Sequence, residues 1–434
     1  MSFTLFLIVH AVLFIRPSEL LPQLGGLPLY NASMLACIVC TLPVLARRLT
    51  LRSLMAQPIT MCILGVLAAV VVSNLANALL PKVFQASTEF LKVVIYYLLF
   101  ISLVTSVRRL RSFLLWFTLL AVGLVLLPVL HFHGKVDLPT LEVLQDVDGD
   151  GNTGTLGTIA RLQATGIFRD PNDLSLIIVI GILVALYWLG DRRHGSLRWL
   201  WLAPLGLFGH ALALTHSRGG LLALVTGLMV FSNIRFGWRK TVLGALCGLP
   251  LLLVVFGPRQ TNLSTTDGTG QERIRIWSDG ILLFRSHPLF GIGTDRYAEE
   301  VGYVCHNSFL HGFAEMGFFG GMFFLGAFYL AIWMLYRMSS RRRWIVDPDL
   351  DRLYPTMAAV LAAYIVGMFS LSLTYVVPTY MILALVTVYQ RLTAVDPPLK
   401  PLRFNGFVLQ RMALASVSFL ALMYVFVRVS VRWS

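Results

Sequence analysis

Residues 305–324 read CHNSFLHGFAEMGFFGGMFF, and they join a polar segment to a long apolar one. The preceding stretch, residues 258–305, is polar and carries several arginines. The run that follows is apolar and long enough to cross a bilayer, for which about 20 helical residues suffice. His306 therefore lies at the predicted mouth of a membrane helix, where a side chain reaches both water and a substrate carried in the lipid.

The composition of the rest of the chain predicts a helical membrane protein. Of the 434 residues, 57% are hydrophobic and 13% are charged, and the mean hydropathy is +0.76. Soluble domains carry about twice that charged fraction. We predict spans near residues 2–15, 28–46, 58–80, 86–106, 112–131, 171–190, 198–214, 219–234, 241–256, 308–336, 354–372, 375–390 and 411–429. The predicted fold is an all-α polytopic membrane protein with about 12–13 transmembrane helices.

The distribution of Lys and Arg predicts the orientation. Cytoplasmic loops are enriched in these residues, and most of the 35 in this chain fall in one alternate set of short loops. The N-terminus is therefore predicted inside, with segments 132–170 and 257–307 outside. The first of these, rich in Gly, Asp and Thr, is expected to be irregular. Because the net charge of +14 follows from this topology, no nucleic-acid partner is expected.

Three consecutive parts are expected. Residues 1–256 form an N-terminal transmembrane bundle with the outer loop 132–170, residues 257–307 an outer segment, and residues 308–434 a C-terminal bundle. Within the outer segment, apolar residues recur near helical period at Ile274, Trp277 and Ile281. We expect an amphipathic helix there, lying on the membrane surface.

Two arginines and one histidine are expected at the same outer depth. Arg218 lies on a tight HSRGG turn between two spans, and Arg273 and His306 belong to the outer segment. Guanidinium groups bind phosphate oxygens in pairs, and an imidazole can accept the proton of a hydroxyl. Together they predict a site for a lipid diphosphate and a hydroxyl acceptor. The alternatives are interfacial snorkelling for Arg218 and a structural role for His306.

Asp146, Asp148 and Asp150 match the first half of a calcium-binding loop. The twelfth position, which should supply a bidentate Glu, is Gly157. A structural Ca²⁺ and an Asp/Gly-rich turn are therefore the two alternatives for this stretch.

The chain resembles the O-antigen ligase and polymerase superfamily of bacterial envelope glycosyltransferases. The stretches that carry the resemblance are THSRGG at 215–220, RIRIW at 273–277 with HPLFGIG at 287–293, HNSFLHGFAEMGFFGG at 306–321 and, more softly, RDPNDLSLI at 169–177. The resemblance implies a GT-C-like fold in the bacterial inner membrane, with a large periplasmic segment and a periplasmic active site. Ligases are usually drawn with twelve crossings and both ends inside, whereas thirteen spans would place this C-terminus outside.

The same resemblance implies a reaction. A glycan would pass from a polyprenyl diphosphate carrier to a hydroxyl of a lipid or protein acceptor, with inversion and without a metal cofactor. His306 would be the general base, and Arg218 and Arg273 would bind the diphosphate and stabilise the leaving group. The further residues implied for substrate binding or support are Arg275, Arg169, Asn307 and Glu315.

Other functions remain open. A polymerase that extends the glycan on its own carrier would share the donor site, so the sequence does not separate it from a ligase. A solute transporter is disfavoured, because transporters bind substrate near the membrane midplane within repeated halves. The candidate residues here lie at the outer face. A non-catalytic assembly scaffold is the remaining alternative.

Overall fold

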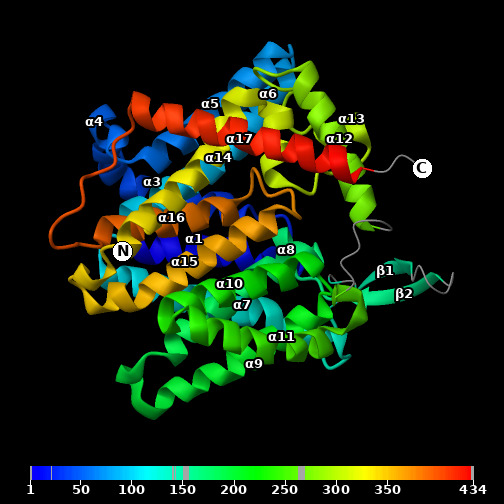
Figure 1. The fold of residues 1–434 in the computed structure, drawn as a ribbon, viewed down its shortest axis with the longest axis vertical. Coiled ribbons are helices and arrows are strands. Elements are labelled where there is room, and N and C mark those ends of the chain that lie inside the picture. Colours follow the sequence, from blue (N-terminus) through cyan, green and yellow to red (C-terminus); the bar gives the residue numbers. More distant parts are fainter. Residues whose placement is uncertain are drawn as a thin grey trace. The chain divides into compact units, whose positions relative to one another are not determined.

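A computed structural model describes residues 2–20, 22–138, 141, 143–149, 156–261 and 269–431, and it is helical almost throughout (Figure 1). The chain divides into two compact units that interleave along the sequence. Unit 1 comprises Met1–Leu42, Leu103–Leu263 and Pro348–Gly367, and unit 2 comprises Pro43–Ser102, Ser264–Asp347 and Met368–Ser434.

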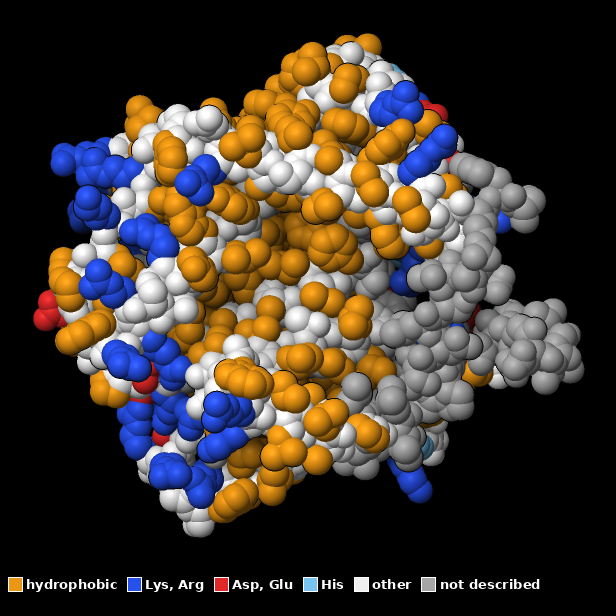
Figure 2. Space-filling model, in the orientation of Figure 1, with side chains coloured by type: hydrophobic (Ala, Val, Ile, Leu, Met, Phe, Trp, Pro, Cys, Tyr) orange, Lys and Arg blue, Asp and Glu red, His pale blue; other side chains and the backbone are white. Residues whose placement is uncertain are grey.

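Ten helical segments of the described ranges are long and apolar enough to cross a membrane, which confirms an all-α polytopic membrane protein. They are Ser2–Glu19, Leu29–Arg48, Pro58–Ala76, Leu80–Leu103, Val107–Phe132, Pro171–Leu189, Arg192–Leu214, Arg218–Phe236, Ser308–Ser339 and Gly406–Ser430. On the face shown in Figure 2, hydrophobic side chains cover the lengths of the helices, and Lys and Arg side chains gather over helix ends. This distribution matches helices that cross hydrocarbon and end in water.

Unit 1 is built around one buried helix. Its elements are α1 (Ser2–Ile15), α2 (Pro17–Leu20), η1 (Pro22–Leu24), most of α3 (Leu29–Arg48), α7 (Val107–Phe132), β1 (Leu144–Gly149), β2 (Leu156–Arg161), η2 (Gly166–Phe168), α8 (Pro171–Leu189), η3 (Arg192–Trp201), α9 (Leu202–Leu214), α10 (Arg218–Phe236), α11 (Trp238–Thr261) and α15 (Pro348–Met368). Helix α8 is apolar on every side and buried along nearly its whole length, packed against α7, α9 and α10. Gly181 allows α9 to pack closely against α8, because a Cβ there would lie 3.0 Å from the Phe208 ring.

The segment 132–170 is not irregular as expected, because it contains a β-hairpin. Strands β1 and β2 pair antiparallel with Leu144 opposite Arg161 and Gly149 opposite Leu156. The apolar residues of β2 and the anchoring of Arg161 to the bundle, described below, account for the ordered pairing. The Gly and Asp content suggested an irregular segment. The residues between the strands, 150–155, all lie outside the described ranges.

Unit 2 is built around α14. Its elements are the end of α3, α4 (Leu51–Met55), α5 (Pro58–Ala76), α6 (Leu80–Leu103), α12 (Thr269–Ser286), α13 (Tyr297–Val301), α14 (Ser308–Ser339), η4 (Arg342–Trp344), α16 (Val377–Leu392) and α17 (Gly406–Ser430). Helices α5 and α14 make the most extensive helix contact. Small residues allow this close approach, since a Cβ on Gly320 would lie 2.8 Å from that of Ala69.

The predicted amphipathic helix is α12. Ile274 and Ile281 are buried with Leu310 of α14 and Met423 of α17, while Leu282 is exposed. The apolar stripe that suggested a helix on the membrane surface is thus largely covered by protein. Helix α12 is a packed part of unit 2, directly beside the start of α14 (Figure 1).

Candidate functional site

His306 directly precedes α14 in a left-handed backbone conformation, with φ 51°. Its backbone N–H donates to the Ser372 hydroxyl at 2.9 Å, and its side chain is half-buried. Asn307 then caps the helix: its Oδ1 accepts the N–H groups of Phe309 and Leu310, each at 3.2 Å. The cap satisfies two of the backbone donors that a helix start leaves open. The sequence prediction of a helix mouth at His306 is therefore correct.

The start of α14 is fastened to the segment before α16. The Ser308 hydroxyl donates to the Leu371 carbonyl at 2.7 Å and accepts the Leu373 N–H at 2.8 Å. Thr374 in turn donates to the Ser308 carbonyl at 2.9 Å. Since Asn307 and Ser308 are fully buried, they shape the backbone beside His306 from the protein interior.

Glu315 is fully buried and contacts His311, not His306. Its Oε1 lies 3.2 Å from His311 Nε2, one helical turn earlier, as the spacing of the two residues indicated. The same oxygen accepts the backbone N–H groups of Arg296 and Tyr297, each at 3.0 Å. Glu315 therefore joins α14 to the start of α13.

The motifs HPLFGIG and EMGFFGG contact each other. Helix α14 is interrupted at Gly317, where φ is 63°, and the N–H of Phe318 donates to the carbonyl of Pro288 at 2.8 Å. Gly291, with φ 70°, passes so close that a Cβ there would lie 2.3 Å from the carbonyl carbon of Glu315. The spacing of these glycines thus reflects a loop packed into a helix kink, which the sequence analysis did not anticipate.

Arg273 and Arg275 lie on α12, both half-buried. The indole N–H of Trp277, one turn after Arg273, donates to the carbonyl of Cys305 at 3.0 Å. Burial raises the pKa of the Cys305 thiol to about 12, so this thiol stays protonated and is a poor nucleophile. In unit 2 the structure therefore connects the arginine-bearing helix to the residue before His306.

Arg218 belongs to unit 1 and is the first residue of α10. His216 is left-handed, with φ 49°, and Ser217 caps the helix by accepting the Gly220 N–H at 3.1 Å. The Ser217 hydroxyl also accepts from Ser175 at 3.1 Å. Gly220 is required here, since a Cβ would lie 2.4 Å from the Ser175 hydroxyl oxygen. The turns at Arg218 and His306 have the same local structure: a histidine with positive φ is followed by a buried N-cap residue.

A residue missed by the sequence analysis, Arg161, anchors the Arg218 turn. Its Nε donates to the Thr215 carbonyl at 2.9 Å, its Nη2 to Asn172 Oδ1 at 3.0 Å, and its Nη1 pairs with Asp146 at 3.0 Å. Arg161 is almost fully buried. The available signal was an arginine next to apolar residues within segment 132–170, which is predicted to lie outside.

The remaining predicted residues of unit 1 lie at the hairpin and near α1. Arg169 is exposed, and its guanidinium pairs with Glu19 at 3.2 Å. Of the calcium-loop residues, Asp146 pairs with Arg161, and Asp150 lies outside the described residues. In the described part of the chain no three potential ligands gather as a metal site.

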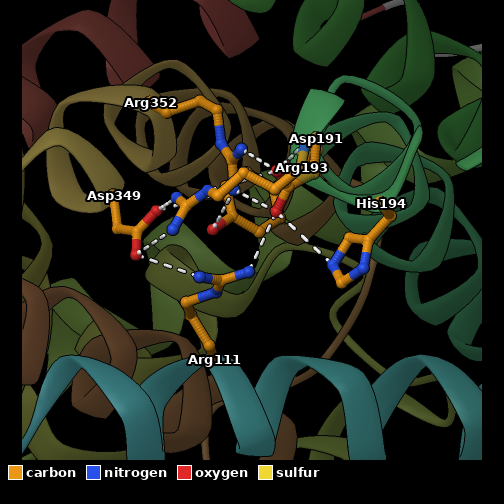
Figure 3. Close-up of polar contacts among 7 residues, drawn as sticks. Arg111, Asp191, Arg193, His194, Asp349 and Arg352 are labelled. Atoms are coloured by element: carbon orange, nitrogen blue, oxygen red, sulfur yellow. Dashed lines mark hydrogen bonds and ion pairs between the residues drawn. The ribbon is translucent and has the colours of Figure 1, made fainter.

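A second polar cluster of unit 1 joins α7, the turn after α8, and α15 (Figure 3). Arg352 contacts both carboxylate oxygens of the fully buried Asp191, with Nη2 to Oδ2 at 2.6 Å. Arg111 bridges Asp191 and Asp349 at 2.9 Å each, and Arg193 also pairs with Asp349. Burial alone would raise the pKa of Asp191, but hydrogen bonds from Arg352 and the Arg193 N–H, with the charges of Arg352 and Arg111, lower it to about 2.

Comparison with known proteins bears on Arg218, Arg273 and His306. Residues 203–325 match the model of the family described as O-antigen ligase. The match begins in α9 and ends in α14, so Arg218, Arg273 and His306 all fall within it. No curated protein matches the chain. The apolar helices and the matched family indicate an integral membrane protein, and the family suggests an O-antigen ligase-like enzyme. Over residues 203–325 the chain is therefore similar to the O-antigen ligase family.

Proposed function

We propose that this protein transfers a glycan from a polyprenyl diphosphate carrier to a hydroxyl group of a lipid or protein acceptor. The observation that carries the proposal is the family match, which spans Arg218, Arg273 and His306. The hydrogen-bonded setting of His306 supports it, because a general base must have a defined position. The reaction occurs at the periplasmic face of the bacterial inner membrane, where the donor is borne by lipid.

His306 is the general base in this proposal. Its half-buried imidazole accepts the proton as the O–H bond of the acceptor breaks, and histidine side chains titrate near neutral pH. The acceptor oxygen then bonds to the anomeric carbon from the face opposite the diphosphate. The bond from that carbon to the phosphate oxygen breaks, and its electron pair leaves with the diphosphate, so the configuration inverts.

Arg218 and Arg273 bind the diphosphate and stabilise the charge that develops as it leaves. Preorganised cations are the usual protein device for such charge, and removing one donor typically slows a reaction about 100-fold or more. Arg275 and Arg169 are further substrate contacts, while Asn307 and Glu315 support the backbone around His306. Because cationic side chains serve the leaving group, the proposed transfer requires no divalent metal.

The test is reconstitution in lipid vesicles with carrier-linked glycan and acceptor extracted from a strain that lacks this chain. We expect His306→Ala to slow transfer about 100-fold or more, and Arg218→Ala and Arg273→Ala to do the same, with EDTA present throughout. His287→Ala and Arg285→Ala are the matched controls, because both remove exposed side chains near or on α12. Wild-type rates in His306→Ala and Arg218→Ala would refute the mechanism.

The products decide between a ligase and a polymerase. A ligase yields long glycan attached to the acceptor, and its loss leaves long chains on the carrier. A polymerase yields longer glycan on the carrier itself, and its loss leaves single repeat units. Electrophoresis of the lipid-linked products from a deletion strain distinguishes the two outcomes.

A further inference from the structure

The arginine-bearing helix α12 is attached near His306 at two adjacent residues. The Trp277 indole N–H donates to the carbonyl of Cys305 at 3.0 Å, and the hydroxyl of Tyr297 donates to the carbonyl of Ile276 at 2.6 Å. Tyr297 is almost fully buried, so little water competes for its hydrogen bond. Both contacts lie within one helical turn of Arg273.

The tyrosine contact requires a specific local sequence. Gly280 lies one turn after Ile276, and a Cβ there would be 2.6 Å from the Tyr297 hydroxyl oxygen. Because Gly280 has no side chain, the Tyr297 hydroxyl can reach the backbone carbonyl of Ile276. The Tyr297 ring also meets the imidazole of His311 edge to face, with centroids 5.7 Å apart. Tyr297 is thus enclosed on both sides.

The backbone of Tyr297 is itself held by α14. Its N–H donates to Glu315 Oε1 at 3.0 Å, and Glu315 also contacts His311. These contacts connect α14 and α12 at two places. Glu315 of α14 holds Tyr297, which bonds to α12. Trp277 of α12 bonds to Cys305, which lies just before the start of α14. Helix α12 cannot slide or rotate without breaking one of these hydrogen bonds.

We propose that Trp277 and Tyr297 are positioning residues that set the placement of Arg273 relative to His306. This inference rests on the proposed function, in which the two residues act on the leaving group and the acceptor. Neither positioning residue needs to touch substrate. Arg273 and Trp277 are separated by one turn, so a hydrogen bond at Trp277 defines the height and rotation of Arg273. Misplacement of a catalytic group by about 1 Å can slow a reaction about 100-fold.

Kinetics of two conservative variants test the inference. Trp277→Phe removes the indole N–H but keeps an aromatic ring, and Tyr297→Phe removes one oxygen atom. In the vesicle assay with extracted carrier-linked glycan, we expect kcat to fall about 10- to 100-fold in each, while KM for the donor stays within about threefold. The control is Tyr303→Phe, which removes the same oxygen from an exposed tyrosine two residues before Cys305.

The outcomes separate this inference from the proposed function. Activity in His306→Ala at the wild-type rate overturns the function itself. If His306→Ala is inactive while both phenylalanine variants keep the wild-type kcat, only the positioning role is overturned. A lowered Tm with unchanged kcat also overturns it, because the contacts would then be merely structural. Should Trp277→Phe fail to fold, Tyr297→Phe decides alone.

Discussion

Gly291 and Gly317 allow a loop and a helix kink to share backbone hydrogen bonds beside the candidate site. Both have positive φ, 70° and 63° respectively. A Cβ on Gly317 would lie 2.4 Å from the carbonyl carbon of Leu289, a backbone atom that no rotamer change can move away. With ψ at −166°, Gly317 also lies in a backbone region that is essentially restricted to glycine and costs other residues about 1–3 kcal/mol.

Gly317→Ala should therefore lower the free energy of unfolding by about 2 kcal/mol or more, from backbone strain and overpacking together. Gly312→Ala is the matched control on the same helix, because its Cβ would meet the Phe324 ring at an ordinary 3.4 Å. Thermal unfolding in detergent measures both. Equal effects of the two substitutions on Tm would contradict the role assigned to the kink.

At the residue scale, spacing along one helix indicates local contacts but not distant ones. The Asp170 cap of α8 and the pair of His311 with Glu315 are local contacts of this kind. Arg161 was missed because its carbonyl partner, Thr215, lies far along the chain and carries no side-chain signature. A backbone acceptor can belong to any residue type, so such contacts are invisible in a sequence.

At the scale of elements, the cluster around Asp191 joins three helical segments of unit 1 through charge. Asp191 lies in the turn after α8, Arg111 near the start of α7 and Arg352 near the start of α15 (Figure 3). These segments carry many of the arginines that predicted the cytoplasmic side. Some of these arginines therefore form ion pairs that hold the helical segments of unit 1 together.

Asp191→Asn should destabilise the protein by about 2 kcal/mol, the free energy that corresponds to the lowered pKa. Because the folded-state pKa lies near 2, this contribution is complete above about pH 4 and is lost as the pH falls towards 2. Stability of the wild type and the variant, measured by chemical unfolding, should converge over that range. The control Glu89→Gln breaks an exposed pair with Lys92 and should cost less than about 1 kcal/mol. A constant difference from pH 7 to pH 2 would exclude this assignment.

Element boundaries were predictable where capping residues mark them. The span predicted at 171–190 is α8, Pro171–Leu189, and the span predicted at 308–336 is α14, Ser308–Ser339. The hairpin β1–β2 was missed because its short strands are rich in the residues of turns. Hydropathy also gave no sign of the kink at Gly317, since the apolar run continues through it.

For the whole molecule, hydropathy predicted the class of fold but not which helices pair. Each unit draws helices from distant parts of the chain. Lipid tails are as apolar as leucine, so helix pairing in a membrane depends on shape, above all on small residues. The close approach of Gly320 to Ala69 illustrates this, because hydropathy marks neither residue as a point of helix contact.

The course of α17 bears on the number of membrane crossings. Just before α17, the Lys400 carbonyl accepts from Arg337 at the end of α14, at 2.7 Å. At the other end of α17, the Ser430 carbonyl accepts from Gln271 at 3.3 Å, and Val427 packs in the same apolar cluster as Cys305. Helix α17 therefore runs antiparallel to α14 over a similar length and ends beside the start of α14.

We consequently expect the end of α17 to lie on the same side of the membrane as His306, which corresponds to thirteen crossings and an N-terminus on the opposite side. In a variant without native cysteines, a cysteine appended after Ser434 should react with a membrane-impermeant maleimide added to intact spheroplasts, as should Tyr303→Cys. Ser340→Cys, exposed at the other end of α14, should react only after permeabilisation. If the appended cysteine behaves like Ser340→Cys, then α17 does not complete a crossing, and the chain has twelve.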